Sequence, residues 1–117
     1  MQGTVAYLSG TAAEDAVARR YAGSGHALVA RRWRGLGGEI DLILRRGAEI
    51  VFVEVKKGRD AARAAERLSQ RQIGRLLTAA AEYLGGEPAG QDTPARFDVA
   101  LMDATGSITV IENALVP

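Results

Sequence analysis

The chain has 117 residues, 47% of them hydrophobic and 25% charged, and its net charge at neutral pH is +1. These values are typical of one soluble globular domain, predicted over residues 1–117, and they exclude a protein that binds polyanions through bulk charge alone. With no cysteine and a single histidine, His26, disulfides, thiolate or zinc sites and a serine-type triad are excluded, so any metal would have oxygen ligands, as magnesium or manganese does.

The first predicted element is a helix. Thr11 and Glu14 have the spacing of a capping box, which predicts a helix from Thr11 to about Ala22. Residues 26–34, 39–46 and 49–56 then predict three strands, and the last two alternate Ile, Val and Leu with polar residues. Residues 59–68 are rich in arginine and alanine and predict either a helix or a mobile loop.

The second half of the chain repeats the helix-then-strand pattern. Ser69 and Gln72 form a second capping box, followed by an apolar stripe to Leu84 and two glycines that end the helix. Residues 95–102 and 107–112 predict two further strands. The order αβββαββ predicts an α/β fold, with one sheet and helices packed on it.

The turn between the second and third strands fixes which residues face each other. Gly47 stands first in a two-residue loop, the signature of a type II′ hairpin. Arg46 then faces Glu49 and Asp41 faces Glu54, with Cβ atoms about 5 Å apart. Lys56 lies on the same face as Glu54, because side chains in a strand alternate with a period of two.

Asp41, Glu54 and Lys56 therefore form one charged cluster in strands that otherwise predict burial. Two adjacent carboxylates repel each other, and a divalent cation such as Mg²⁺ or Mn²⁺ removes that penalty. The alternative is a buried ion pair with lysine and no metal. Glu39 faces Lys56 in the same pairing, which predicts an ion pair between those two.

The spacing Asp41…Glu54-Val55-Lys56 resembles the signature of the PD-(D/E)xK nuclease superfamily. The surrounding segments resemble the YraN-like family of uncharacterised bacterial proteins over residues 10–114: GTAAEDAVARRY, ARRWRGLGGEIDLIL, VFVEVK, AAAEYL and RFDVALM. That family is similar to archaeal Holliday-junction resolvases. The resemblance implies a restriction-endonuclease-like fold, with a mixed β-sheet flanked by helices, and metal-dependent cleavage of DNA.

The resemblance implies roles for individual residues. Asp41 and Glu54 would be metal ligands with the carbonyl of Val55, and Lys56 would be the catalytic lysine. Glu14 matches a glutamate that reaches the site in the resolvase-like branch, although a capping box explains it equally well. Gln72 stands where many relatives carry lysine, and capping is its favoured role. Relatives carry a small residue and then arginine after the lysine, so Lys57-Gly58 moves the expected phosphate contact to Arg59.

Basic residues form two groups. Arg59, Arg63, Arg67, Arg71 and Arg75 recur every four residues and would form a ridge on one continuous helix, which Ser69 as a cap would break. Arg31, Arg32 and Arg34 flank Trp33. With Lys57, these arginines are candidates for phosphate contacts that position a nucleic acid without reading its sequence, and a solvated surface is the alternative.

Three functions remain open at this point. The first is a magnesium- or manganese-dependent DNA endonuclease, selective for branched DNA and forming a homodimer that cuts two strands of a symmetric substrate. The second is a nucleic-acid-binding module without catalysis, and the third is a protein-interaction factor with a structural ion pair. No apolar run reaches the roughly 20 residues of a membrane span, and no secretory signal pattern is visible, so the predicted location is the cytoplasm.

Overall fold

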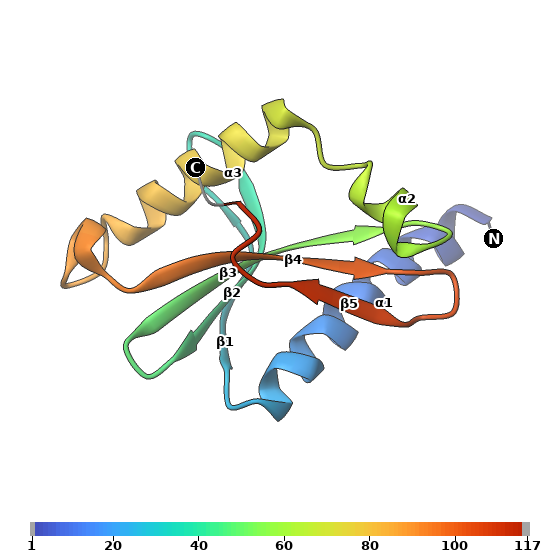
Figure 1. Ribbon diagram of the computed structural model, residues 1–117, viewed down its shortest axis with the longest axis horizontal. Coiled ribbons are helices and arrows are strands. Elements are labelled where there is room, and N and C mark those ends of the chain that lie inside the picture. Colours follow the sequence, from blue (N-terminus) through green and yellow to red (C-terminus); the bar gives the residue numbers. More distant parts are fainter. Residues whose placement is uncertain (1, 116–117) are drawn as a thin grey trace.

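The computed structural model describes the backbone of residues 2–115 and the side chains of residues 11–115. The elements are α1 (Gln2–Gly23), β1 (Ala27–Arg34), β2 (Glu39–Arg46), β3 (Glu49–Lys57), α2 (Ala61–Ala65), α3 (Gln70–Leu84), the 3₁₀ turn η1 (Gly90–Asp92), β4 (Ala95–Met102) and β5 (Ile108–Ile111). The predicted α/β fold is confirmed as a five-stranded mixed sheet flanked by helices, and it is compatible with a nuclease-like fold (Figure 1).

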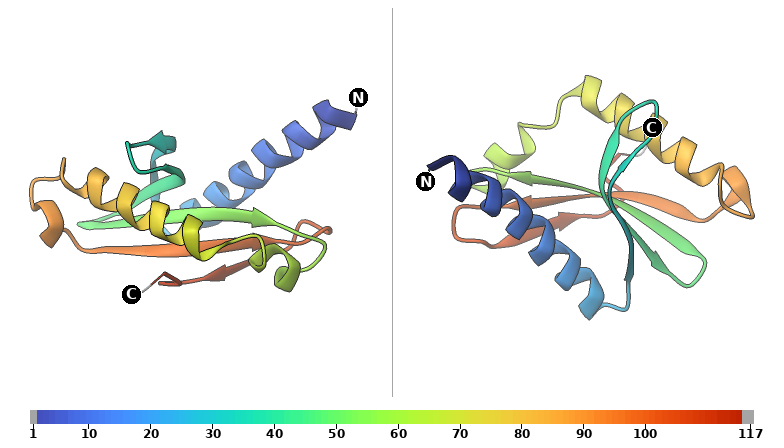
Figure 2. Two further views of the ribbon diagram at one scale, coloured as in Figure 1. Left: turned by 90° about the horizontal axis from the view of Figure 1, so that it is seen from above. Right: turned by 180° about the vertical axis from the view of Figure 1, so that it is seen from behind.

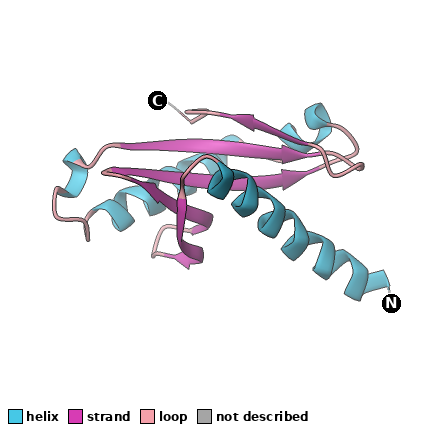
Figure 3. Cartoon of the chain, turned by 90° about the horizontal axis from the view of Figure 1, so that it is seen from below, coloured by secondary structure: helices cyan, strands magenta, loops and turns pink. Residues whose placement is uncertain are grey.

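The sheet has one parallel pair of strands, at its centre. Its strands lie in the order β1-β2-β3-β4-β5. Pairing is antiparallel throughout except between β3 and β4, which run parallel and are linked by the crossover through α2 and α3 (Figure 3). The carboxyl ends of β3 and β4 therefore lie side by side; the chain continues from β3 into α2 and turns back from β4 into β5.

Helices cover both faces of the sheet. On one face Val17 and Tyr21 of α1 pack against alternate residues of the central strands, among them Leu44, Val51 and Val53. On the other face the apolar side of α3 packs against the alternate set, including Ile43, Ile50, Phe52, Phe97 and Val99. Helix α1 lies behind the sheet in Figure 1 and in front of it in the right-hand view of Figure 2.

The first helix begins earlier than its sequence pattern predicts. It starts at Gln2, so Thr11 lies inside it and the predicted capping box at Thr11 and Glu14 is wrong. No proline interrupts residues 2–10, so nothing forces the helix to begin at the Thr11 pattern. Glu14 is thus a residue of the helix interior, free of any capping role.

The second capping box is half correct. Ser69 caps α3, and its hydroxyl accepts the Gln72 backbone N–H at 3.1 Å. Residues 59–68 contain the short helix α2, which Asp60 caps by accepting the Arg63 backbone N–H at 2.8 Å. The chain between α2 and α3 is not helical, so the predicted arginine ridge is broken there.

The predicted hairpin pairing is confirmed over most of its length. Residues pair from Arg46 with Glu49 to Leu42 with Val53, and Gly47 takes the positive φ of 60° that the tight turn requires. The pairing stops at Leu42. Beyond it, the first half of β2 and the second half of β1 rise out of the plane of the sheet, as the teal segment of Figure 2 shows.

Strand β1 carries the irregularities that allow this bend. Its pairing with β2 shifts between Leu28 and Ala30, which leaves Val29 as a bulge. Arg32, opposite the bend, has a φ of 48°, an unusual left-handed conformation for a residue other than glycine. Bulges and left-handed residues bend a strand, and here they turn the hairpin away at the position of Asp41.

No helix among the described residues is long and apolar enough to cross a membrane. The prediction of a single domain over residues 1–117 stays a prediction, and residues 1, 116 and 117 lie outside the described residues.

Candidate active site

Asp41 lies where β2 leaves β3. Its Oδ2 accepts the backbone N–H of Val55 at 2.8 Å, in place of a backbone carbonyl of β2. Counted from the hairpin turn, the strand pairing ends at Leu42, one residue short of Asp41. The predicted pairing of Asp41 with Glu54 in a regular ladder is therefore not formed. The N–H and C=O of one strand residue point to the same neighbouring strand. The Val55 carbonyl therefore faces the opening that the departing strand leaves.

Glu54 is the buried acid of the site. Its side chain has a relative exposure of 5%, and Oε2 accepts from Gln72 Nε2 at 2.9 Å and lies 3.2 Å from Lys56 Nζ. Its Oε1 is buried and has no hydrogen-bond partner among the described residues. Burial, and after it the negative charge of Asp41, raise the pKa of Glu54 to about 8, although the Lys56 ammonium offsets part of the effect.

The partners of Lys56 and Gln72 differ from the sequence prediction. Lys56 pairs with Glu54, whereas Glu39 pairs with Arg34 at 2.9 Å, so the predicted Lys56–Glu39 pair is wrong. The bend at Asp41 ends the pairing that would have placed Glu39 opposite Lys56. Gln72 contributes its backbone N–H to the cap and its side chain to Glu54. The amide is therefore part of the site, a role that the sequence signalled only through its resemblance to relatives with lysine there.

These residues line one hollow of about 350 Å³, called here the carboxylate hollow. Four of its lining residues carry a carboxylate: Glu14, Glu39, Asp41 and Glu54. Glu14 reaches it from α1, and its Oε1 lies 3.2 Å from Arg32 Nε. The bent hairpin, β3, α1 and α3 thus bring to one place the four residues predicted as catalytic: Glu14, Asp41, Glu54 and Lys56.

The chemistry of this donor set fits a hard divalent cation. A buried carboxylate oxygen without a partner, beside a second carboxylate, is an arrangement that a cation would satisfy. Among the described residues no three acidic, histidine or cysteine side chains gather as a metal site by themselves. Magnesium is commonly held by one or two carboxylates, with water and substrate phosphate completing its shell, so two carboxylates and the Val55 carbonyl suffice.

The predicted nucleic-acid-binding arginines fall into two groups. Arg31, Arg32 and Arg34 are each paired with an acid, namely Asp15, Glu14 and Glu39. Arg63 pairs with Glu66 at 3.4 Å. These four pairs favour the solvated-surface interpretation for their arginines. Arg71 is exposed on α3, and Lys57, Arg59 and Arg67 line a second hollow next to the carboxylate hollow.

Gly58 explains one departure from the pattern of relatives. A Cβ at residue 58 would lie 2.4 Å from the backbone nitrogen of Ala64, so no side chain fits without moving α2. Its backbone N–H also donates to the Met102 carbonyl at 3.0 Å, which extends the pairing of β3 with β4. Glycine at this position therefore allows α2 to lie directly against the end of β3.

Comparison with known proteins places the chain in a family. The model of the uncharacterised protein family UPF0102 matches residues 13–102, which include every residue of the carboxylate hollow. A UPF0102 protein of Cereibacter sphaeroides is 59% identical over 114 residues, 97% of each chain. One from Ruegeria pomeroyi is 60% identical over 113 residues, 97% of this chain and 92% of the relative. The predicted YraN-like membership is confirmed.

Proposed function

The chain belongs to the uncharacterised protein family UPF0102, and for this member we propose a nuclease that uses Mg²⁺ or Mn²⁺ to hydrolyse phosphodiester bonds of DNA. The observation that carries the proposal is the buried Glu54, which has a raised pKa and an unpartnered Oε1 beside Asp41 and Lys56. The resemblance of the sequence to the PD-(D/E)xK superfamily and to archaeal Holliday-junction resolvases supports DNA, and branched DNA in particular, as the substrate.

Each residue of the carboxylate hollow has a role in this proposal. Asp41, Glu54 and the Val55 carbonyl would hold the metal, which when bound stabilises negative charge on a phosphate and lowers the pKa of water. The Val55 N–H holds Asp41 Oδ2, so Oδ1 is the carboxylate oxygen that would bind the metal. Gln72 holds Glu54 Oε2 in the same way.

Lys56 is the proposed catalytic lysine. Its ammonium lies 3.2 Å from Glu54 Oε2 and its side chain is only 18% exposed, so it is held close to the acid that would bind metal. A positive charge in a partly desolvated position stabilises the charge that develops on a phosphate oxygen and orients the attacking water. Glu14, held by Arg32 at the rim, is placed to orient a second water.

The proposal is tested by manganese-dependent cleavage of a labelled four-way DNA junction. We expect wild-type protein to cut it, and Lys56→Ala to bind manganese but not cut. Arg46→Gln is the matched control, because Arg46 is a basic residue at the hairpin turn, outside the carboxylate hollow. Linear duplex DNA and RNA in parallel reactions identify the preferred substrate. Equal cleavage by wild type and Lys56→Ala would contradict the proposal.

A non-catalytic nucleic-acid-binding module is the second candidate. The Gln72 amide, where many relatives carry lysine, favours it because an amide supplies no charge at this end of the hollow. Salt-sensitive binding of branched DNA without cleavage by the wild type, together with a manganese-dependent rise in melting temperature, would select this candidate.

A further inference from the structure

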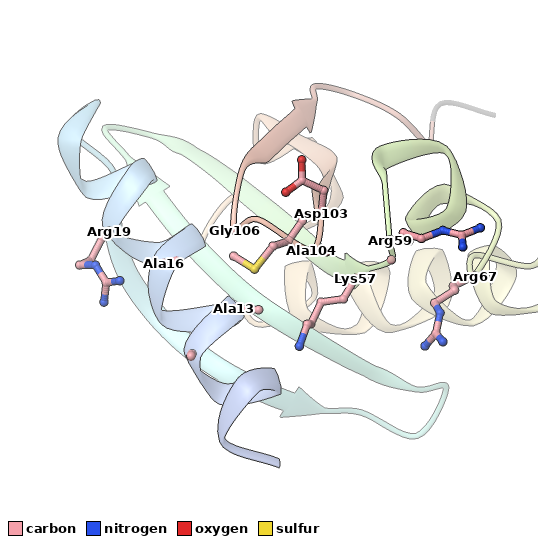
Figure 4. A pocket seen from close by; sticks show the side chains of 12 residues that line it. Ala13, Ala16, Arg19, Lys57, Arg59, Arg67, Asp103, Ala104 and Gly106 are labelled. Carbon is pink, nitrogen blue, oxygen red and sulfur yellow. The ribbon is translucent and has the colours of Figure 1, made fainter. Parts of the chain in front are cut away.

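A larger hollow, of about 860 Å³, lies beside the carboxylate hollow and is called here the basic hollow. Four basic side chains line it: Arg19, Lys57, Arg59 and Arg67. Its wall on α1 consists of three alanines and Arg19, and it lies at the carboxyl ends of β3 and β4 (Figure 4). In open α/β sheets ligands bind in the crevice outside the carboxyl ends of the strands.

The basic side chains of this hollow have no ion-pair partner among the described residues. Among the described side chains none of these four basic residues forms an ion pair, whereas Arg31, Arg32 and Arg34 all do. The one acid in its lining, Asp103, is used by its own turn, where it accepts the Thr105 N–H at 2.9 Å and the Ser107 N–H at 3.0 Å. The lining thus carries four basic side chains against one carboxylate, and a hollow with such an excess of positive charge attracts polyanions.

Figure 4 shows how these charges are distributed. The nitrogen ends of Arg19, Lys57 and Arg67 reach the same side of the view, and the Asp103 carboxylate turns to the opposite side. Arg19 comes from α1, Lys57 from the end of β3, and Arg67 from the segment after α2. The cations are thus spread along the hollow from three elements, an arrangement suited to an extended anion with charges at intervals.

The two hollows adjoin each other. Ala13 and Lys57 line both of them. On α1, Glu14 lines one and Arg19 the other, and five residues of helix correspond to about 7.5 Å. Successive nucleotides of one strand rise by about 3.4 Å in B-DNA. A strand that enters the carboxylate hollow would therefore bring phosphates over the basic hollow within about two nucleotides.

We propose that the basic hollow binds the sugar–phosphate backbone of the nucleic-acid strand that enters the carboxylate hollow, with Arg19 as a phosphate-binding residue. The identity of the anion as nucleic acid rests on the proposed function; the binding surface rests on the unpaired charges. Contacts to phosphates position a strand and do not read its bases. Gly58 contributes by letting α2 lie against β3, which places Arg59 and Arg67 along the same hollow.

The salt dependence of DNA binding tests the proposal. Fluorescence anisotropy with a labelled duplex in EDTA, from about 50 to 200 mM salt, measures the slope of log K against log salt. We expect the magnitude of this negative slope to decrease by about 0.9 in Arg19→Gln, by the same amount in Arg67→Gln and by about 1.8 in the double variant. Arg46→Gln removes the same charge at the hairpin turn, about 26 Å along β3 from Lys57. We expect this variant to keep the wild-type slope.

A scan of neutral linkages locates the contacts. One methylphosphonate is moved stepwise along a short strand that only just spans the two hollows and so binds in one register, and affinity is measured for each position with each variant. Wild-type protein loses affinity at a few neighbouring linkages. Arg19→Gln becomes insensitive at one end of that set and Arg67→Gln at the other, as a double-mutant cycle requires.

The outcomes separate this proposal from the proposed function. Reduced slopes and shifted patterns without any cleavage would support the strand-binding hollow and remove the nuclease. Cleavage with unchanged slopes and patterns in Arg19→Gln and Arg67→Gln would overturn the hollow and keep the nuclease. An equal loss of slope in Arg46→Gln would reduce the effect to general charge and overturn it. Displacement of the DNA by inorganic phosphate at matched phosphate concentration would assign the hollow to small anions and also overturn it.

Discussion

Two buried carboxylates on neighbouring strands have opposite surroundings. Asp98 of β4 is fully buried and accepts from Tyr21 Oη at 2.6 Å, from Arg96 Nε at 3.1 Å and from the Asn113 N–H at 2.9 Å. Glu54 of β3 is nearly as buried, yet one of its oxygens has no partner among the described residues. Saturated hydrogen bonding marks Asp98 as a structural acid, whereas the unpartnered Oε1 of Glu54 is what the proposed role as a metal ligand requires.

The largest expected effect is on the saturated acid. Asp98→Asn leaves Arg96 beside a neutral amide and removes an acceptor from Tyr21, so we expect the free energy of unfolding to fall by roughly 3 to 5 kcal/mol. Denaturant titration measures it. Glu66→Gln, which breaks the exposed Arg63–Glu66 pair, is the control and changes stability by less than about 1 kcal/mol. A wild-type midpoint for Asp98→Asn would show that the network is not stabilising.

The second effect is a pH dependence at Glu54. Because its pKa is raised to about 8 in the folded protein, the folded state binds more protons than the unfolded state between about pH 4.5 and 8. The associated stability is fully present below about pH 4.5 and is lost as the pH rises through 8, by roughly 2 to 4 kcal/mol in metal-free protein. Denaturation in EDTA across this range measures the loss.

Glu54→Gln is the matched variant for the pH experiment. It removes the titrating group and keeps the volume and the Gln72 contact, so the difference between wild type and variant isolates Glu54 from the other acids. We expect the variant to lack this slope and, at pH 8 in EDTA, to be at least as stable as the wild type. Parallel pH curves for the two proteins would show that Glu54 is an ordinary acid.

The smallest of the three effects is at Tyr21. Burial and the Asp98 carboxylate raise the pKa of its hydroxyl, which therefore remains a neutral donor. Tyr21→Phe deletes the bond to Asp98 Oδ2 and lowers the free energy of unfolding by about 1.5 to 3 kcal/mol. Combined with Asp98→Asn, the two losses should be less than additive, since both variants break the same bond. Strict additivity would indicate that the two residues act independently.

The same comparison explains what the sequence could predict. The hairpin register, the glycine turn and the Ser69 cap depend on neighbours in the chain, and local patterns predicted them correctly. Counting outward from the two-residue turn anticipated that Asp41, Glu54 and Lys56 lie close together, although the ladder ends at Leu42 and Asp41 meets β3 through the Val55 N–H instead. The Asp98 network could not be anticipated, because Tyr21 and Asp98 are 77 positions apart and meet only after the sheet and α1 have packed.

Within the site, prediction failed where the backbone is irregular. Counting along an ideal ladder placed Glu39 opposite Lys56. The hairpin bends at Asp41, however, and Glu39 forms an ion pair with Arg34 instead. Capping preference explained the hydrogen bond of the Gln72 backbone N–H to Ser69. It did not explain the position of the Gln72 side chain, whose amide donates to Glu54 in the site. Arg19 has no sequence signal of its own; only the position of α1 over the end of β3 gives it a role.

The irregular strand β1 also bears on how the protein behaves in a crowded solution. An exposed edge strand is a template on which another chain can add a strand and begin to aggregate. Here one edge carries a bulge at Val29, a left-handed residue at Arg32 and three arginines, and the other edge, β5, is only four residues long. The bend that forms the carboxylate hollow thus also protects the sheet against edge-to-edge growth. A dimer of this protein would accordingly join through helices or loops rather than through one continuous sheet.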